Sequence, residues 1–412
     1  MKSYACRFCG AALQHSFCDL GVSPLSNAFV RPEHLDRPEP FYPLHAYVCD
    51  QCWLVQLPEH QTPTHIFADD YAYFSSYSES WLAHARAYTD SMIARFDYDA
   101  RSQVVEVASN DGYLLQYFQA RGVPVLGIEP ATNCARVAQE KGIPTQVEFF
   151  GLGSAQQLVA RGTRADLLLG NNVLAHVPDI NDFVAGLAVL LKPDGVVTME
   201  FPHLLELIRH NQFDTIYHEH YSYLSLLTVE QVFARHGLTV FDVQQLTTHG
   251  GSLRIFARHA ADASKPVCAA VAAVRVQEKD AGLDTLAPYA AFAGRVTETR
   301  LQLLEFLIAA KRAGKRVWGY GAPAKGNTLL NYCGVRTDLL QATVDRSPHK
   351  QGQFLPGTRI PVHAPERLVQ ERPDYLLILP WNLKDEITAQ MAHIRDWGGR
   401  FVVPIPDVRV LE

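Results

Sequence analysis

Residues 103-QVVEVASNDGYLLQYF-118 predict a strand, a tight turn and a helix in direct succession. The valine-rich segment 104–107 has the composition of a strand that is buried on both faces. Segment 109-SNDG-112 has the chemistry of a turn, and residues 113–119 continue as a helix. A buried strand that passes through a short turn into a helix is the opening unit of a doubly wound α/β sheet.

The same unit recurs directly downstream. Residues 123–130, 165–172 and 195–202 predict further buried strands, with helical segments between them. Ligands of parallel sheets bind at the carboxyl ends of the strands, so the polar side chains at these ends are expected to share one crevice. The residues at or near this edge are Glu106, Ser109, Glu129, Asn171, Asn172 and His176.

The N-terminal segment has the pattern of a small module stapled by metal. Residues 1–70 are punctuated by prolines and show little helical periodicity. Two CxxC pairs provide four thiolates at the spacing of a structural zinc site, although 39 residues separate the pairs. A redox role is the alternative, but it requires one CxxC motif beside a thioredoxin-like strand. We therefore expect a structural zinc ion on Cys6, Cys9, Cys49 and Cys52.

The composition limits the classes of partner. The chain has 412 residues, of which 48% are hydrophobic and 19% charged, as in a folded protein with two or three domains. A net charge of −6 and the lack of a Lys/Arg-rich run argue against nucleic acid as a partner. The N-terminal MKSYACRFCG lacks the apolar region of a signal peptide, and no apolar stretch is long enough to span a bilayer. We expect a cytoplasmic protein without a membrane partner.

The turn after the first strand discriminates between cofactors. A carboxylate that closes the second strand, here Glu129, accepts hydrogen bonds from both ribose hydroxyls of NAD or S-adenosylmethionine. A dinucleotide needs G-x-G-x-x-G at the first turn, whereas 108-ASNDG-112 has a single glycine. The acidic Glu106 and the polar turn suit a cationic sulfonium better than an anionic pyrophosphate. We therefore expect S-adenosylmethionine.

A second α/β unit is expected near the C-terminus. An alanine-rich helical tract covers residues 263–313, and strands are predicted within 315–320, 340–347, 374–380 and 400–406, which form a smaller parallel sheet. In 319-GYGAPAKGNTLL-330 a strand ends in glycines and a helix begins near Asn327, an arrangement in which amides and Lys325 meet phosphate. The motif is neither a dinucleotide fingerprint nor a P-loop, and a nicotinamide cofactor is the rival ligand.

The segment 217-YHEHYSYLS-225 is dense in proton-handling groups. A metal site would favour HExxH on a helix, whereas His218 and His220 are two residues apart and share a face only in a strand. A hydrogen-bonded structural cluster is a second possibility. The third is proton abstraction, because imidazole has a pKa of roughly 6.5 and acts as a base near neutral pH. Local spacing does not choose between His218 and His220.

Together these motifs resemble the three-domain sugar C-methyltransferases that act on nucleotide-linked 4-ketohexoses. The resemblance covers essentially the whole chain, with the motifs in the family's order. It implies a zinc-binding module over 1–70, a central class I, Rossmann-like S-adenosylmethionine methyltransferase domain over 71–262, and a smaller Rossmann-like α/β domain over 263–412. The motifs are the four cysteines, 105-VEVASNDGYLL-115, 127-GIEP-130, 170-GNNVLAHVPD-179, 217-YHEHYSYLS-225 and 319-GYGAPAKGNTLLNY-332.

The resemblance also implies roles for individual residues. His220 would remove the proton from carbon 3 of a 4-keto-6-deoxy sugar, with Tyr217 and Glu219 as orienting groups and His176 near the keto group. The methyl group would then be added with inversion at carbon 3. The cofactor residues implied are Tyr71, Glu106, Ser109, Asn110, Gly112, Glu129, Asn171 and Asn172, with Ser76 and Ser78 beside them. The residues implied for the sugar nucleotide are Gly321, Ala322, Lys325, Asn327 and Asn382.

The expected substrate is a thymidine diphosphate (dTDP) sugar of deoxysugar biosynthesis, bound between the second and third domains of a monomer. Two alternatives stay open from the residues alone. An O- or N-methyltransferase would need no carbon acid, and a zinc-ribbon binding module would use the α/β domains only as scaffolds.

Overall fold

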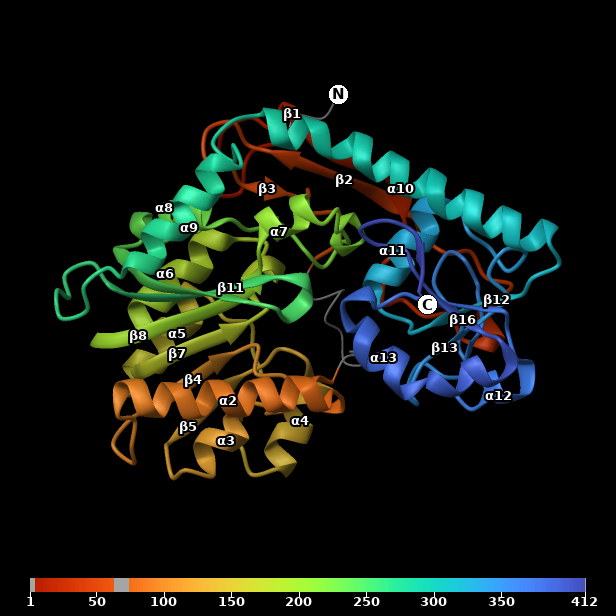
Figure 1. Cartoon of the computed structure of the whole chain (residues 1–412). Helices are drawn as coiled ribbons and strands as arrows, with labels where there is room; N and C mark the ends of the chain where they lie inside the picture. The colour runs from red at the N-terminus through yellow and green to blue at the C-terminus, as the bar shows by residue number, and fades with distance from the viewer. Residues whose placement is uncertain (1–3, 63–73, 412) are drawn as a thin grey trace.

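The chain folds around three β-sheets (Figure 1). The computed structural model describes residues 4–62 and 74–411, and in this part of the chain the sheets have four, seven and six strands. The seven-stranded sheet forms the centre of the methyltransferase-like unit, the four-stranded sheet lies above it in Figure 1, and the six-stranded sheet lies to its right. The prediction of an α/β fold is confirmed.

The central sheet has the order β10-β11-β8-β7-β4-β5-β6. β4 pairs in parallel with both β5 and β7, whereas β11 is antiparallel to its two neighbours. The parallel part places the carboxyl ends of successive strands along one edge. The strands are β4 (Val104–Val107), β5 (Val125–Ile128), β6 (Thr145–Gln146), β7 (Ala165–Asn171), β8 (Leu191–Pro202), β10 (Leu238–Leu246) and β11 (Ser252–His259).

Successive residues of the central strands enter different hydrophobic cores, as the two-residue period of a strand requires. Val104 joins one core and Val105 the other, and Leu167 and Leu168 divide in the same way. The first core packs between the sheet and three helices that lie together below it in Figure 1: α2 (Glu79–Phe96), α3 (Leu115–Gln119) and α4 (Thr132–Glu140). The second core packs between the sheet and α5 (Leu152–Ala160), α6 (Ile180–Leu190) and α8 (Leu226–Arg235).

The N-terminal module shares its sheet with the central domain. β1 (His15–Ser23), β2 (Tyr42–Val48) and β3 (Val55–Gln56) are antiparallel neighbours, and β3 also pairs with β9 (Ser222–Tyr223). β9 belongs to the YHEHYSYLS segment, so the zinc module and that segment are joined by main-chain hydrogen bonds. A two-residue strand gives no periodic signal, and the sequence alone did not predict this pairing.

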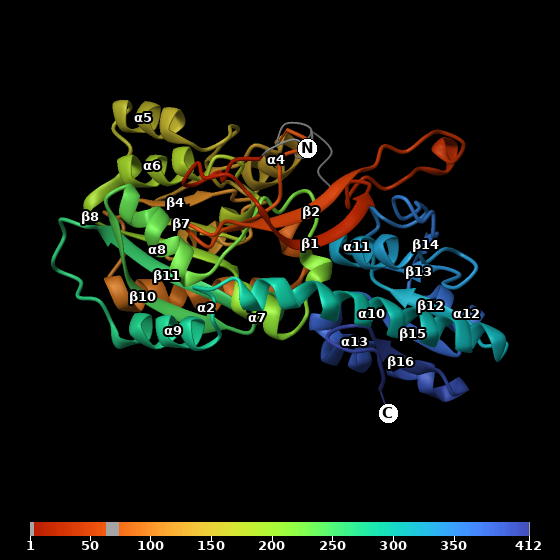
Figure 2. The same ribbon diagram turned by 90° about the horizontal axis from the view of Figure 1, so that it is seen from above.

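The alanine-rich tract contains two helices rather than one. α9 (Ala269–Asp280) packs on β10 and α8 of the central domain. α10 (Ala287–Arg312) runs beside β1 and reaches the C-terminal sheet, as Figures 1 and 2 both show. Phe17 of β1 stacks on Phe292 of α10 with ring centroids 4.6 Å apart. The long helix therefore joins the N-terminal module to the C-terminal domain, and it also contacts α7 (Leu204–Arg209) of the central domain.

The C-terminal sheet has the order β14-β13-β12-β15-β16-β17, and its pairs are parallel except β16 with β17. Its first helix begins at Ala324, three residues earlier than the sequence indicated. The C-terminal elements are β12 (Val317–Tyr320), α11 (Ala324–Cys333), β13 (Thr343–Val344), β14 (Val362–His363), α12 (Arg367–Glu371), β15 (Tyr375–Ile378), α13 (Lys384–Gln390), β16 (Arg400–Val403) and β17 (Arg409–Val410).

None of the helices in the described ranges combines the length and the apolarity that a membrane span requires.

Candidate active site

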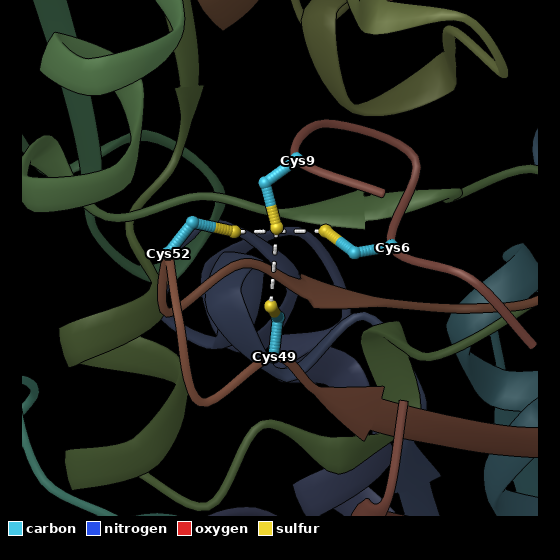
Figure 3. A group of neighbouring side chains, drawn as sticks. All are labelled: Cys6, Cys9, Cys49 and Cys52. Atoms are coloured by element: carbon cyan, nitrogen blue, oxygen red, sulfur yellow. Dashed lines mark hydrogen bonds between the residues drawn. The ribbon is translucent and has the colours of Figure 1, made fainter. Parts of the chain in front are cut away.

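The four predicted zinc ligands converge in the N-terminal module (Figure 3). Their sulfur atoms all lie within 4.8 Å of one another, with 3.6 Å between Cys6 and Cys52 and 3.5 Å between Cys9 and Cys49. A tetrahedron with Zn–S bonds of about 2.3 Å has edges of about 3.8 Å, which matches this cluster. Gln56 also donates a hydrogen bond of 3.1 Å to the Cys6 sulfur. The cluster has the geometry of a closed, structural zinc site.

The first turn of the central sheet is shaped by left-handed backbone. Ala108, Asn110 and Gly112 all have positive φ. A side chain at Gly112 would place its Cβ 2.3 Å from Cδ1 of Ile143, so a larger residue would have to displace that side chain. The turn folds over the end of β5, where Glu129 accepts hydrogen bonds of 2.8 Å from the amides of Asn110 and Ala131. The carboxylate thus fixes the turn and lies at the sheet edge, as predicted.

Two buried acidic residues face this turn. Burial raises the pKa of Glu129 to about 7, although the two amide hydrogen bonds lower it in part. Glu106 is 0% exposed, and burial raises its pKa well above the ordinary value, with the Tyr113 hydroxyl acting in the opposite direction. Among the described residues, neither carboxylate oxygen of Glu106 nor the Ser109 hydroxyl has a hydrogen bond of ordinary geometry. Such buried, unsatisfied oxygens fit a polar, cationic ligand at this edge.

The end of β7 lies at the same edge of the sheet as the ends of β4 and β5. The Asn171 amide donates to the Tyr113 hydroxyl at 3.4 Å, and the Asn172 amide donates to Nε2 of His249 at 3.0 Å. Trp81 of α2 packs edge to face on His249, with 5.2 Å between ring centroids. His249 lies in η5 (Thr248–Gly250), and the sequence analysis did not select it. Its only local signal was its place directly before the Gly-Gly turn that precedes β11.

An ion-pair cluster supports the same edge from β8. Glu200 is 0% exposed and receives hydrogen bonds from His84 at 2.9 Å, Arg254 at 2.6 Å and Thr248 at 2.9 Å. The four residues come from α2, β8, η5 and β11. Because they are far apart in sequence, no local motif identified the cluster. Thr248 precedes His249, so the cluster also holds the loop that carries this histidine.

The Glu200 cluster predicts acid sensitivity. Burial alone would raise the pKa of Glu200, but His84 and Arg254 outweigh it and bring the value to about 2 from 4.5. A lowered folded-state pKa stabilises the fold above pH 4.5, and this stabilisation, roughly 3 kcal/mol, is lost as the pH falls towards 2. Glu200→Gln is expected to reduce the free energy of unfolding at pH 7 and to flatten its decline below pH 4.5. Urea unfolding at several pH values measures both, and a parallel decline in wild type and variant would contradict the prediction.

Two of the predicted catalytic histidines lie against each other. The rings of His176, in η3 (Leu174–His176), and His220 have centroids 4.6 Å apart and are nearly perpendicular. His220 Nδ1 lies 2.8 Å from the carbonyl oxygen of Thr215. A carbonyl only accepts, so Nδ1 carries the proton and Nε2 keeps its lone pair. The Tyr217 ring lies over His220 at 4.0 Å between centroids.

The neighbouring residues of the segment point in other directions. Nε2 of His218 donates to the carbonyl of Pro43 at 3.2 Å, and its ring meets Tyr42 of β2 edge to face. The Glu219 carboxylate accepts a hydrogen bond of 2.6 Å from Asn27, while its main-chain carbonyl accepts from the His176 ring. His218 and Glu219 therefore contact the zinc module, and His220 faces His176.

The histidines are neutral near pH 7. Burial lowers the pKa of His176 and of His249 to about 4. Burial, followed by the influence of His176, lowers the pKa of His220 well below the ordinary 6.5. The charge of Lys325, and that of His249 when it is protonated, act in the same direction on the pKa of His220. A neutral imidazole with a free lone pair has the protonation state that a base requires.

Lys325, a residue of the C-terminal domain, acts through its charge on His220 and His249. Its Nζ donates to Asn382 at 2.8 Å and lies 4.6 Å from the centre of the Trp381 ring. The Trp381 indole N–H donates in turn to Asp214 of η4 (Phe213–Thr215) at 2.7 Å. Asp214 is 0% exposed, and burial raises its pKa to about 6, while Lys325 and Trp381 lower it in part. Asp214 lies three residues before YHEHYSYLS in the sequence, but no local motif indicates that it pairs with Trp381 of the C-terminal domain.

The other predicted sugar-nucleotide residues have partners within the protein. The Ala322 amide donates to the Asp345 carboxylate at 2.6 Å, and the Asn327 amide group donates to the carbonyl of Ser26 at 2.6 Å. Gly321 is in the left-handed region, where a Cβ would lie 2.6 Å from Pro380. Asn327 thus connects the C-terminal domain to the zinc module, whereas Lys325 binds Asn382 of its own domain and its charge acts on His220 and His249.

The segment before α2 is described in part. Tyr71 lies outside the described residues. The Ser75 amide donates to the Asn110 side chain at 2.9 Å, and the Ser76 hydroxyl donates to Asp111. Ser78 caps α2, because its hydroxyl accepts from the Trp81 amide at 3.3 Å. This segment therefore contacts the turn that was predicted to hold the cofactor.

Three family models match successive parts of the chain. A zinc binding domain matches residues 6–67, a methyltransferase domain matches residues 81–243, and the C-methyltransferase C-terminal domain matches residues 247–406. The last match begins before β11, which the structure places in the central sheet.

Individual proteins are similar to the chain over different lengths. The chain is 38% identical over 406 residues to C-methyltransferase NovU of Streptomyces niveus, and the alignment covers 98% of this chain and 96% of that protein. A ubiquinone biosynthesis O-methyltransferase of Azorhizobium caulinodans is 26% identical over 116 residues, 26% of this chain and 46% of that protein. The crystal structure of magnesium protoporphyrin IX methyltransferase from Synechocystis PCC 6803 with bound SAH covers 43% of this chain and 82% of that one, with 15% identity and a TM-score of 0.34.

Proposed function

The chain belongs to the three-domain C-methyltransferase family, and on this premise we propose that it methylates carbon 3 of a nucleotide-linked 4-keto-6-deoxy sugar. It is a methyltransferase that uses S-adenosylmethionine and carries a structural zinc site. The observation that carries the proposal is the tautomer of His220. Its Nδ1 proton is held by the Thr215 carbonyl, its ring lies against His176, and the charge of Lys325 in the C-terminal domain acts on it.

Carbon is a poor nucleophile towards a sulfonium methyl group until a proton next to a carbonyl has been removed. In the proposed reaction His220 Nε2 takes the proton from carbon 3. The electrons of the C–H bond form a double bond between carbons 3 and 4, and the carbonyl π electrons move to the keto oxygen. Tyr217 packs against the His220 ring, and Thr215 fixes its tautomer. Methylation opposite to the departing proton inverts carbon 3.

The residues at the edge of the central sheet fit S-adenosylmethionine. When bound, the cofactor supplies an electrophilic methyl group on a cationic sulfur. Glu129 is proposed to accept hydrogen bonds from the ribose hydroxyls. Glu106 and Ser109, whose buried oxygens lack hydrogen bonds of ordinary geometry within residues 4–62 and 74–411, are proposed to face the amino-acid part. The remaining residues proposed for the cofactor are Tyr71, Asn110, Gly112, Asn171 and Asn172.

The sugar nucleotide is proposed to bind between the central and C-terminal domains. Lys325 and Asn382 lie on the C-terminal side, and His176 and His220 on the central side. Gly321, Ala322 and Asn327 are proposed to line the same region rather than each to contact the ligand, because the Ala322 and Asn327 donors already have partners. A dTDP-linked sugar is the substrate proposed.

Methyl transfer to carbon tests the function. The enzyme is incubated with a dTDP-4-keto-6-deoxy sugar and S-adenosylmethionine labelled with ¹³C in the methyl group, and the product is analysed by two-dimensional NMR. The labelled methyl is expected to couple to a quaternary or tertiary ring carbon at position 3. A methyl group bound to oxygen or nitrogen would contradict the proposal, and so would the absence of any labelled sugar.

Glu129→Gln is expected to weaken cofactor binding. A hydrogen bond to a charged group contributes about 1.5–3 kcal/mol, so the dissociation constant of S-adenosylhomocysteine should rise by roughly 10- to 100-fold. Isothermal titration calorimetry measures this constant. Glu140→Gln is the matched control, because Glu140 is exposed on α4. Equal affinities for both variants and the wild type would place the ribose elsewhere.

A further inference from the structure

We propose that Lys325 donates a hydrogen bond to the keto oxygen of the sugar and stabilises the negative charge that forms there when carbon 3 loses its proton. This inference rests on the proposed function and assigns the lysine to the reacting end of the substrate. The sequence motif around Lys325 had favoured the diphosphate instead. Three features of the structure support the new assignment: how the ammonium group is held, how it is connected to His220, and how its charge is balanced.

The ammonium group is held in a fixed position by the C-terminal domain. Lys325 is the second residue of α11, and its Nζ donates to Asn382 at 2.8 Å. The aromatic face of Trp381 lies 4.6 Å from the same nitrogen. An ammonium group has three N–H donors, and in the described part of the chain Asn382 is the hydrogen-bond acceptor found for Lys325. The remaining donors are available to a ligand.

The same three residues of the central domain hold both Lys325 and His220. Asp214 accepts from Trp381, on which Lys325 lies, and Thr215 accepts from the His220 ring. The next residue, Ile216, accepts a hydrogen bond of 3.1 Å from Thr328 of α11. The segment 214–216 therefore sets the position of the lysine relative to the imidazole. The lysine charge also acts directly on the ring, since it contributes to the lowered pKa of His220 and of His249.

The surrounding charges keep the lysine suited to this role. Burial lowers the pKa of Lys325, and Asp214 raises it in part. Asp214 is fully buried, and its Oδ1 has no hydrogen-bond partner among the described residues. The groups on which the lysine charge acts are this carboxylate and the histidines His220 and His249, whose lowered pKa values leave the two rings neutral near pH 7. Lys325 thus supplies the positive charge that acts on the neutral histidine rings and on the Asp214 carboxylate.

The proposed contact matches the charge that the reaction creates. When His220 takes the proton, the electron pair of the C–H bond becomes part of the double bond between carbons 3 and 4, and one negative charge develops on the keto oxygen. Lys325 stays protonated and donates to this oxygen. Carbon 3 would then form its new bond to the methyl group while the methyl–sulfur bond breaks, with the electron pair of that bond left on the sulfur of S-adenosylhomocysteine. The keto group is restored, and His220 releases its proton to water. A fixed donor at a developing oxyanion contributes about 10²- to 10³-fold in rate.

Proton–deuterium exchange at carbon 3 tests the assignment without methyl transfer. A dTDP-4-keto-6-deoxy sugar is incubated in heavy water with S-adenosylhomocysteine and the wild type, Lys325→Met or Lys325→Arg, and exchange is followed by NMR. Lys325→Met is expected to lower the exchange rate by about 10²- to 10³-fold, and Lys325→Arg, which keeps the charge, to lose less. Lys311→Met, on the exposed face of α10, is the control and should match the wild type.

Binding of dTDP alone separates the two possible roles of the lysine. The affinity for dTDP, measured by calorimetry, is expected to stay within about threefold in Lys325→Met, because this ligand lacks the keto group. A large loss of dTDP affinity would assign Lys325 to the diphosphate and overturn the inference. Undiminished exchange in Lys325→Met would overturn it as well. If the wild type itself catalysed no exchange, this result would contradict the proposed function. It would also contradict the role of Lys325, because that role rests on the proposed function.

Discussion

His220→Ala is expected to lower proton–deuterium exchange at carbon 3 by about 10²- to 10⁴-fold and to lower methyl transfer to the same extent. The imidazole is the proposed base, and alanine offers no group that accepts a proton. Exchange is followed by NMR in heavy water with S-adenosylhomocysteine present. Binding of S-adenosylhomocysteine should be unchanged, because the cofactor edge is formed by β4, β5 and β7.

His218→Ala is the matched control, since it removes the same side chain two residues away. His218 donates to Pro43 of the zinc module and does not share the ring contact between His176 and His220. Its loss is expected to reduce stability and to leave the exchange rate of the folded enzyme near that of the wild type. Exchange that persists in His220→Ala and disappears in His218→Ala would transfer the role of base to His218.

The pH dependence provides a second readout for His220. Its folded-state pKa is lowered by burial, and the neutral form is the active base above that pKa. The exchange rate is therefore expected to remain on its plateau as the pH falls below 6.5 and to decline only at lower pH. A midpoint at or above 6.5 would show that the base is an ordinary exposed histidine or a different group.

The cofactor edge could be predicted from sequence because it depends on local pattern. A strand of four valine-rich residues followed by a turn places Glu106 and Ser109 at the sheet edge, and the next strand places Glu129 beside them. The zinc ligands were equally accessible, since two CxxC pairs carry the signal themselves. In both cases short-range spacing fixes which side chains meet.

The reacting end of the site could not be predicted in this way. His249 reaches Asn172 only because β11 folds back beside β8, and Asp214 meets Trp381 across 167 residues. The direction of Lys325 depends on how α11 packs on η4, which the motif around it does not encode. Likewise, β9 is too short for its pairing with β3 to give a periodic signal. These contacts are set by packing between domains rather than by local propensity.

Loss of the zinc site is expected to lower methyl transfer by about 10²-fold or more, although none of the four cysteines is proposed to bind the substrate. Cys6 and Cys9 flank Arg7, whose guanidinium donates to the carbonyls of Leu57 and Pro178 at 2.5 Å each. Pro178 follows His176 by two residues, so the metal-bound loop holds the segment that carries this histidine. A displacement of about 1 Å at a reacting group costs on the order of 10²-fold in rate.

The zinc module also holds the segment that carries His220. The Leu57 amide donates to the carbonyl of Tyr221 at 3.0 Å, and the Tyr221 amide donates to the carbonyl of Ala175 at 2.8 Å. The Arg7 guanidinium lies 5.2 Å from the centre of the Tyr221 ring. Structural zinc contributes on the order of 10 kcal/mol to the folding of small modules, so its removal should release both histidine segments together.

Cys49→Ser tests this coupling, with Cys18→Ala as the control, because Cys18 is buried in β1 of the same module and is not one of the four clustered cysteines. Cys49→Ser is expected to lose zinc by elemental analysis and to exchange its amides faster at 174–178 and 217–225. S-adenosylhomocysteine binding should persist, since Glu106, Ser109 and Glu129 lie at the ends of β4 and β5 and outside the two histidine segments. A zinc-free variant with normal exchange and activity would show that the module is independent of the active site.

Arg7→Met separates the metal from the contact that transmits its effect. The four cysteines remain, so the variant is expected to keep its zinc. The two hydrogen bonds from the Arg7 guanidinium to the main-chain carbonyls of Leu57 and Pro178 are lost. Each hydrogen bond from a charged group contributes about 1.5–3 kcal/mol, enough to let the His176 segment move. Activity should fall with zinc content unchanged and with faster amide exchange at 174–178. If activity fell only when zinc was lost, the coupling would have to pass through the pairing of β3 with β9 instead.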